Sequence, residues 1–149
     1  MGLGNPILCD DGVGNRVADI LQRKIEDPEV TVTETNAVGL GLLDVLVGYQ
    51  RAIIIDAVPS REGKVGQVYR LTAEDFRLSQ HLCSPHDVDF ASALELGKRL
   101  GLSLPEEIII FAVEVADITT FSESLTPEVE AVVPQVIQMV LDQLANAGQ

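Results

Sequence analysis

Two uninterrupted aliphatic runs place the strongest limit on how this chain can fold. They read "RAIIIDAV" at 51–58 and "EEIIIFAVEV" at 106–115. Strands that lack an alternation of polar and apolar residues are typical of parallel sheets, in which both faces are covered. The sequence therefore predicts buried strands at the centre of the molecule, with helices packed on either side.

The segments around these runs alternate between helix and strand patterns. Apolar residues recur at helical spacing in 11–24, where Asp10 can cap the first turn, and in 126–144, which Pro134 should kink. Shorter patterns predict a strand at 29–35, a helix at 41–49, an edge strand at 66–71 and a helix at 84–101 capped by Ser84. This order predicts one domain over 1–149, an α/β three-layer sandwich with a twisted, mostly parallel sheet flanked by helices.

Composition narrows the class of protein. The formal net charge is −13, which argues against nucleic acid as a partner because polyanion binding depends on clustered Lys and Arg. No apolar run approaches the roughly 18 residues of a membrane span, so no membrane insertion is expected, and no secretory pattern follows Met1. Cys9 and Cys83 are too few for a disulfide framework. We therefore expect a cytoplasmic protein.

Three polar residues occupy positions where such sheets bind ligands, beyond the carboxyl ends of the strands. Asp11 follows the opening turn "GLGNPILC", Asp56 ends the aliphatic run 53–55, and His86 lies in the first turn of the 84–101 helix. If their loops share one edge of the sheet, two carboxylates and one imidazole converge there. Such a set can bind a borderline divalent ion such as nickel or zinc, with positions left for a substrate. Asp56 could instead act as a base on a metal-bound water.

Simpler roles are open for each of these residues. Asp10 and Asp11 can be acids at a helix start, Asp56 can bind the backbone of the next loop, and His86 can lie on the surface. Cys9 could be a nucleophile with His86 as its base. The two neighbouring acids raise the pKa of that thiol, which favours an apolar packing role for Cys9.

Three segments together resemble the hydrogenase maturation proteases: "GLGNPILCDDGVG", "IIIDAV" and "SPHDVDFASALELG". The resemblance runs in order through nearly the whole chain, and the pattern GNxxxxDDGxG with a later SxH is its most specific part. It implies a phosphorylase/hydrolase-like fold. It also implies an endopeptidase that removes the C-terminal extension from the precursor of the nickel–iron hydrogenase large subunit.

The resemblance further implies a metal-recognition role for Asp11, Asp56 and His86. In the family these positions contact nickel that is already loaded in the precursor, so no permanent cofactor is expected. For the chemistry itself, which the resemblance does not supply, we expect a metal-activated water with Asp11 or Asp56 as its base.

Two features depart from the family pattern. The loop at 34–43 reads "ETNAVGLGLL", where family members carry Gly-Gly-Thr or Gly-Thr. Family members also carry several aliphatic residues before the GLGN turn, which form a central strand, whereas only Met1 precedes Gly2 here. We therefore expect the first central strand to be missing and this sequence to begin late.

Two other functions fit parts of the sequence. A non-catalytic nickel-binding or chaperone protein for hydrogenase assembly would use the same three residues without hydrolysis. Peptidyl-tRNA hydrolases resemble the chain in GLGNP, but they need a basic face for tRNA and a histidine soon afterwards, where this chain has DDGVG.

Overall fold

The computed structural model describes residues 1–60, 63–78 and 85–148, with the backbone alone for 76–78 and 85–89. This part of the chain forms one five-stranded sheet in the order β2-β1-β3-β5-β4. The strands are β1 (Gly2–Leu3), β2 (Glu34–Thr35), β3 (Arg51–Pro59), β4 (Val68–Thr72) and β5 (Glu107–Val115). Neighbouring strands are parallel except for β4, which lies antiparallel to β5 at an edge. The predicted mostly parallel sheet is confirmed.

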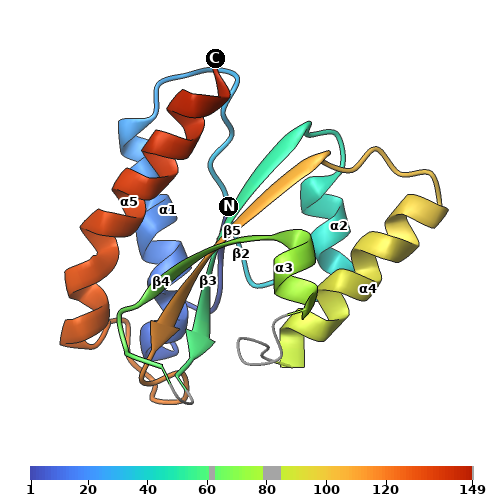
Figure 1. Cartoon of the computed structure of the whole chain (residues 1–149). Coiled ribbons are helices and arrows are strands. Elements are labelled where there is room, and N and C mark those ends of the chain that lie inside the picture. Colours follow the sequence, from blue (N-terminus) through green and yellow to red (C-terminus); the bar gives the residue numbers. More distant parts are fainter. Residues whose placement is uncertain (61–62, 79–84, 149) are drawn as a thin grey trace.

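Helices cover both faces of the sheet (Figure 1). They are the 3-10 helix η1 (Cys9–Gly12), α1 (Val13–Lys24), α2 (Gly41–Leu46), α3 (Ala73–Leu78), α4 (Pro85–Arg99) and α5 (Pro127–Ala147). One core lies between the sheet and the pair α1 and α5, and a second lies between the sheet and the pair α2 and α4. The predicted three-layer sandwich is therefore confirmed.

The two aliphatic runs form the central strands β3 and β5, which pair in register from Arg51 with Glu107 to Pro59 with Val115. Odd-numbered residues such as Ile55 pack toward α1 and α5, and even-numbered residues such as Ile54 pack toward α2 and α4. Because both faces are buried, neither strand can alternate polar and apolar residues.

Strands β1 and β2 both differ from the sequence prediction. The first central strand, expected to be missing, is present as two residues between β2 and β3. The Met1 amino group extends this contact by donating a hydrogen bond to the Ile53 carbonyl at 2.7 Å. At the sheet edge, β2 covers Glu34–Thr35 rather than 29–35, because its neighbour β1 offers only two residues for pairing.

The helix α3 was not predicted, although its start has a recognisable signal. The Thr72 hydroxyl accepts the Asp75 backbone N–H at 3.1 Å, and the Asp75 carboxylate accepts the Thr72 backbone N–H at 3.0 Å. These reciprocal bonds form a capping box, which the letters "TAED" encode. The predicted Ser84 cap of α4 lies outside the described residues. None of the described helices combines the length and apolar character needed to cross a membrane.

Asp10 does not cap α1, which corrects the sequence prediction. The helix begins at Val13, after η1, and has no side-chain cap. Asp10 is fully buried instead. Its carboxylate accepts the backbone N–H groups of Ala116, Asp117 and Thr126 at 2.7–3.1 Å and the Thr126 hydroxyl at 2.9 Å. Asp10 therefore joins the first loop of the chain to the segment between β5 and α5.

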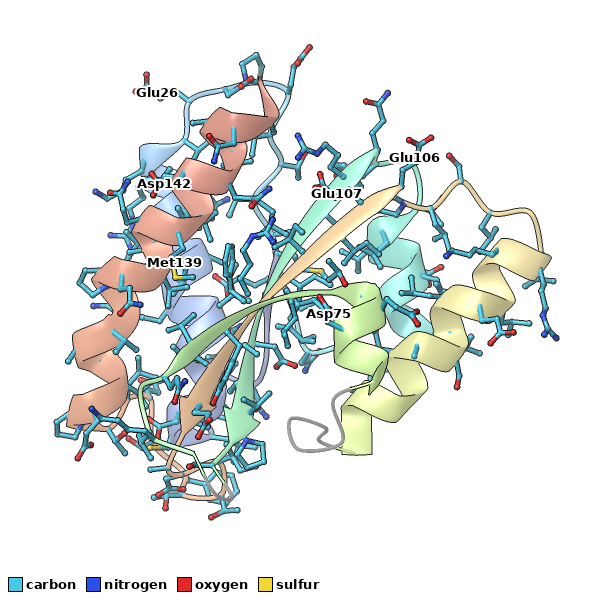
Figure 2. All side chains as sticks on the ribbon, in the orientation of Figure 1. Glu26, Asp75, Glu106, Glu107, Met139 and Asp142 are labelled. Carbon is cyan, nitrogen blue, oxygen red and sulfur yellow. The ribbon has the colours of Figure 1, made fainter. Side chains whose placement is uncertain are left out.

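Replacing this carboxylate tests how much it contributes to the free energy of unfolding. In Asp10→Asn one side-chain oxygen becomes an NH2 group that faces N–H donors, so at least one charge-assisted hydrogen bond is lost. We expect the free energy of unfolding in urea to fall by about 2–3 kcal/mol. The control is Asp142→Asn, which alters an exposed acid on α5 (Figure 2). An equal change in both variants would contradict this role for Asp10.

Candidate active site

The chain changes direction in the sheet between β1 and β3. From β1 it passes through α1 to β2 on one side, and from β3 it continues toward β5 on the other. Such a switch point leaves a crevice beyond the carboxyl ends of the strands, where α/β proteins bind ligands. A cavity of about 310 Å³ lies there, and both Asp11 and Asp56 line it.

Asp11 reaches the cavity from η1. Its Oδ2 atom accepts the backbone N–H of Asn5 at 2.9 Å, and the Asn5 side-chain oxygen accepts the backbone N–H of Ile7 at 3.2 Å. These bonds close the turn that follows β1. The Asp11 carboxylate is therefore held by the turn that follows β1.

Glycines allow this turn to lie close to its neighbours. Gly4 has a φ of 149°, and a Cβ atom there would lie 2.0 Å from the Asp11 carbonyl oxygen. At the start of α1, a Cβ atom on Gly14 would lie 2.5 Å from the Ile55 carbonyl oxygen. Any side chain at either position would force the backbone apart. The glycines thus bring the Asp11 loop onto β3, the strand that carries Asp56.

Asp56 lies within β3 and is 8% exposed. It follows Ile55, which pairs with Gly2 of β1. Because side chains alternate along a strand, Asp56 shares the face of Ile54, toward α2 and α4. The short β1 ends beside this position, so the cavity reaches the Asp56 side chain.

His86 lies in the first turn of α4, and its side chain is outside the described residues. Phe90, four residues further along α4, lines the same cavity as Asp11 and Asp56. The structure therefore brings the two predicted carboxylates together, and it leaves the place of the imidazole as a prediction. Among the described side chains, no group of three or more His, Cys, Asp or Glu residues could hold a metal ion.

Cys9 is buried and lines a different cavity from Asp11 and Asp56. Burial raises the pKa of its thiol, and the Asp10 carboxylate raises it further. The thiolate is therefore disfavoured, which argues against Cys9 as a nucleophile. The packing role suggested by the sequence fits this environment better.

Two asparagines in the cavity wall were not identified from the sequence. Asn5 and Asn36 both line the cavity. Asn5 precedes Pro6 in the opening turn, and an asparagine in a turn of this kind often bonds to nearby backbone. Asn36 directly follows β2, and no local pattern distinguishes it.

Comparisons of this chain with known proteins identify the same family by sequence model and by individual relatives. A family model described as "Hydrogenase maturation protease" matches residues 15–143. The Hydrogenase 2 maturation protease of Escherichia coli (strain K12) is 27% identical over 150 residues, which cover 99% of this chain and 90% of that protein.

Solved structures show the same fold. The hydrogenase maturating endopeptidase HybD from E. coli has a TM-score of 0.85 at 27% identity, covering 99% of this chain and 91% of that one. The [NiFe] hydrogenase maturation protease HybD from Thermococcus kodakarensis has a TM-score of 0.71 at 25% identity, covering 95% of each chain.

The α/β sandwich with a cavity at its switch point has the architecture of ligand-binding α/β proteins. The chain belongs to the hydrogenase maturation proteases and is a peptide hydrolase of the endopeptidase type. The family resemblance found in the sequence is confirmed. This membership favours a protease over the nickel chaperone and the peptidyl-tRNA hydrolase.

The loop between β5 and α5 forms one wall of the cavity through Ile118. Asp117 organises this loop by accepting hydrogen bonds from the Thr120 hydroxyl at 2.6 Å and from the backbone N–H groups of Thr120 and Thr119 at 2.9 and 3.0 Å. These bonds, those from Thr120 foremost, lower the pKa of the Asp117 carboxyl from 3.8 to about 2.

This lowered pKa predicts a pH-dependent contribution to stability. A carboxylate with a depressed folded-state pKa stabilises the fold fully above its unfolded pKa of 3.8 and loses that effect as pH falls toward 2. The stability advantage of the wild type over Asp117→Asn should therefore be largest above pH 4 and shrink below it. Urea unfolding at pH 5 and pH 3 measures this, and a difference that does not change with pH would contradict it.

Proposed function

We propose that this endopeptidase removes the C-terminal extension from the nickel-loaded precursor of a [NiFe] hydrogenase large subunit. In this proposal Asp11, Asp56 and His86 contact the nickel. The observation that carries it is that Asp11 and Asp56, far apart in the sequence, line one cavity at the switch point of the sheet. The names of the relatives, which are hydrogenase maturation proteases, support a hydrogenase precursor as the substrate.

The donor set suits an ion that arrives with the substrate. Carboxylate and imidazole groups bind borderline divalent ions such as nickel. Two carboxylates and one imidazole leave coordination positions unfilled, and ligands of the precursor would occupy them. The nickel is thus cargo of the substrate rather than a cofactor of the protease. Because the site gains these contacts only with a loaded precursor, it favours the loaded state by differential binding.

The same residues can supply the acid–base chemistry. A water molecule attacks the carbonyl carbon of the scissile peptide bond, the C–N bond breaks, and a water proton is transferred to the leaving nitrogen. Asp11 or Asp56 carries that proton as the general base and then as the acid. The adjacent nickel of the substrate polarises the water or the peptide carbonyl.

Substitution of the three residues tests this assignment. In Asp11→Asn, Asp56→Asn and His86→Ala, we expect processing of nickel-loaded precursor to slow by about 100-fold or more, since each removes a metal contact or a base. A gel shift of the large subunit measures cleavage, and thermal melts show whether each variant is folded. Asp142→Asn serves as the control. Wild-type activity in a folded Asp11→Asn or His86→Ala variant would remove that residue from the site.

Dependence on the metal is a separate prediction. The wild-type protein should bind nickel-loaded precursor at least about tenfold more tightly than nickel-free precursor, which corresponds to roughly 1.4 kcal/mol of differential binding. Asp11→Asn should lose most of this difference. Titration calorimetry with both forms of the precursor measures it. Equal binding and equal cleavage of the two forms would contradict nickel recognition while leaving the endopeptidase activity intact.

A further inference from the structure

The structure leaves one aromatic side chain almost wholly uncovered on the loop that contributes Ile118 to the cavity wall. Phe121, in the loop between β5 and α5, is 82% exposed, the largest value among the exposed large apolar side chains of the described residues. Ile7, in the loop after β1, is 46% exposed. Figure 1 places the loop that contains Phe121 at the carboxyl ends of β3 and β5.

These two side chains belong to loops that are hydrogen-bonded to each other. The Ser122 backbone N–H donates to the Ile7 carbonyl at 3.0 Å, and the Cys9 backbone N–H donates to the Ser122 carbonyl at 2.9 Å. Leu8 and Ile118, from the same two loops, line the cavity. Ile7 and Phe121 thus lie on two paired loops that each contribute a residue to the cavity wall, and we call these two exposed apolar residues the lip.

The lip is held in place rather than left loose. Asp117 fixes the start of the Phe121 loop through Thr119 and Thr120. Asp10 binds the backbone at both ends of the loop, near Ala116 and Thr126. On an ordered loop backbone, an aromatic side chain has only two rotatable angles to fix on binding, which suits an interface anchor.

From this arrangement we propose that Ile7 and Phe121 dock the polypeptide substrate by contacting apolar side chains next to the segment that enters the cavity. This inference rests on the proposed function. A cavity of about 310 Å³ holds only a few side chains. A stable protein–protein contact covers about 800 Å² on each partner, so a protein substrate must also cover the surface around the cavity. The lip is exposed apolar surface on the two loops that contribute Leu8 and Ile118 to the cavity wall.

A residue near the amino end of β5, at the opposite end of the sheet from the cavity, supplies a matched control. Leu100 is 67% exposed and lies between the end of α4 and the start of β5. Figure 2 labels Glu106 and Glu107 at this end of the sheet, away from the carboxyl ends of β3 and β5. Leu100→Ser therefore removes a comparably exposed apolar side chain without touching the cavity or the lip.

The test compares Phe121→Ser, Phe121→Leu and Leu100→Ser in steady-state processing of a nickel-loaded [NiFe] hydrogenase large-subunit precursor. Phe121→Ser should raise KM by about tenfold or more, as expected for an interface anchor. Its kcat should stay within about twofold of wild type. The contact would stabilise the bound substrate and the transition state equally, so its loss leaves the chemical step unchanged. Phe121→Leu should restore most of the KM, and Leu100→Ser should change neither constant.

Several outcomes would overturn the docking role. An unchanged KM for Phe121→Ser would do so, and so would a loss of kcat at constant KM, which would place the residue in the chemistry. If the wild type binds the precursor without cleaving it, the proposed function fails but the lip is still judged by binding. In that case Phe121→Ser must raise the Kd relative to Leu100→Ser, and equal Kd values would refute the lip.

Discussion

The buried carboxylate of Asp10 connects the parts of the molecule on which the site depends. A charged group without solvent is stable only where hydrogen bonds replace its hydration. Here the backbone N–H groups of Ala116, Asp117 and Thr126 and the Thr126 hydroxyl supply them. Thr126 precedes α5, yet its hydroxyl donates to Asp10 and does not cap the helix. The stability of this carboxylate therefore requires that the loop before α1 and the loop before α5 adopt their places together.

The fold was predictable from the sequence wherever a segment's pattern follows from burial on both faces. The aliphatic runs became β3 and β5, and the apolar stripe of 126–144 became the core of α5. Boundaries failed where pairing depends on a distant neighbour. The alternation in 29–35 is a genuine strand pattern, yet only Glu34–Thr35 pair, because β1 is two residues long. The sequence of a strand does not show how many residues its neighbouring strand offers for pairing.

The position of the site could be predicted because it lies at the switch point of a parallel sheet. Asp11 follows the turn after β1, and Asp56 lies on the adjacent strand β3, so both line one cavity. Asp56 lies within β3 rather than at its end, because the strand continues to Pro59. Asp10 was misread as a helix-start acid because its partners lie more than 100 residues away. Asn36 lacked any signal, since its place in the cavity wall depends on where the edge strand β2 ends.

The two adjacent acids show how one turn serves both structure and function. In a 3-10 helix successive side chains are rotated by about 120°, since three residues complete a turn. Within η1, Asp10 can therefore face inward to the loop before α5 while Asp11 faces the cavity. The 3-10 turn fixes the direction of Asp11 by burying Asp10, which ties the geometry of the proposed metal contact to the stability of the fold itself.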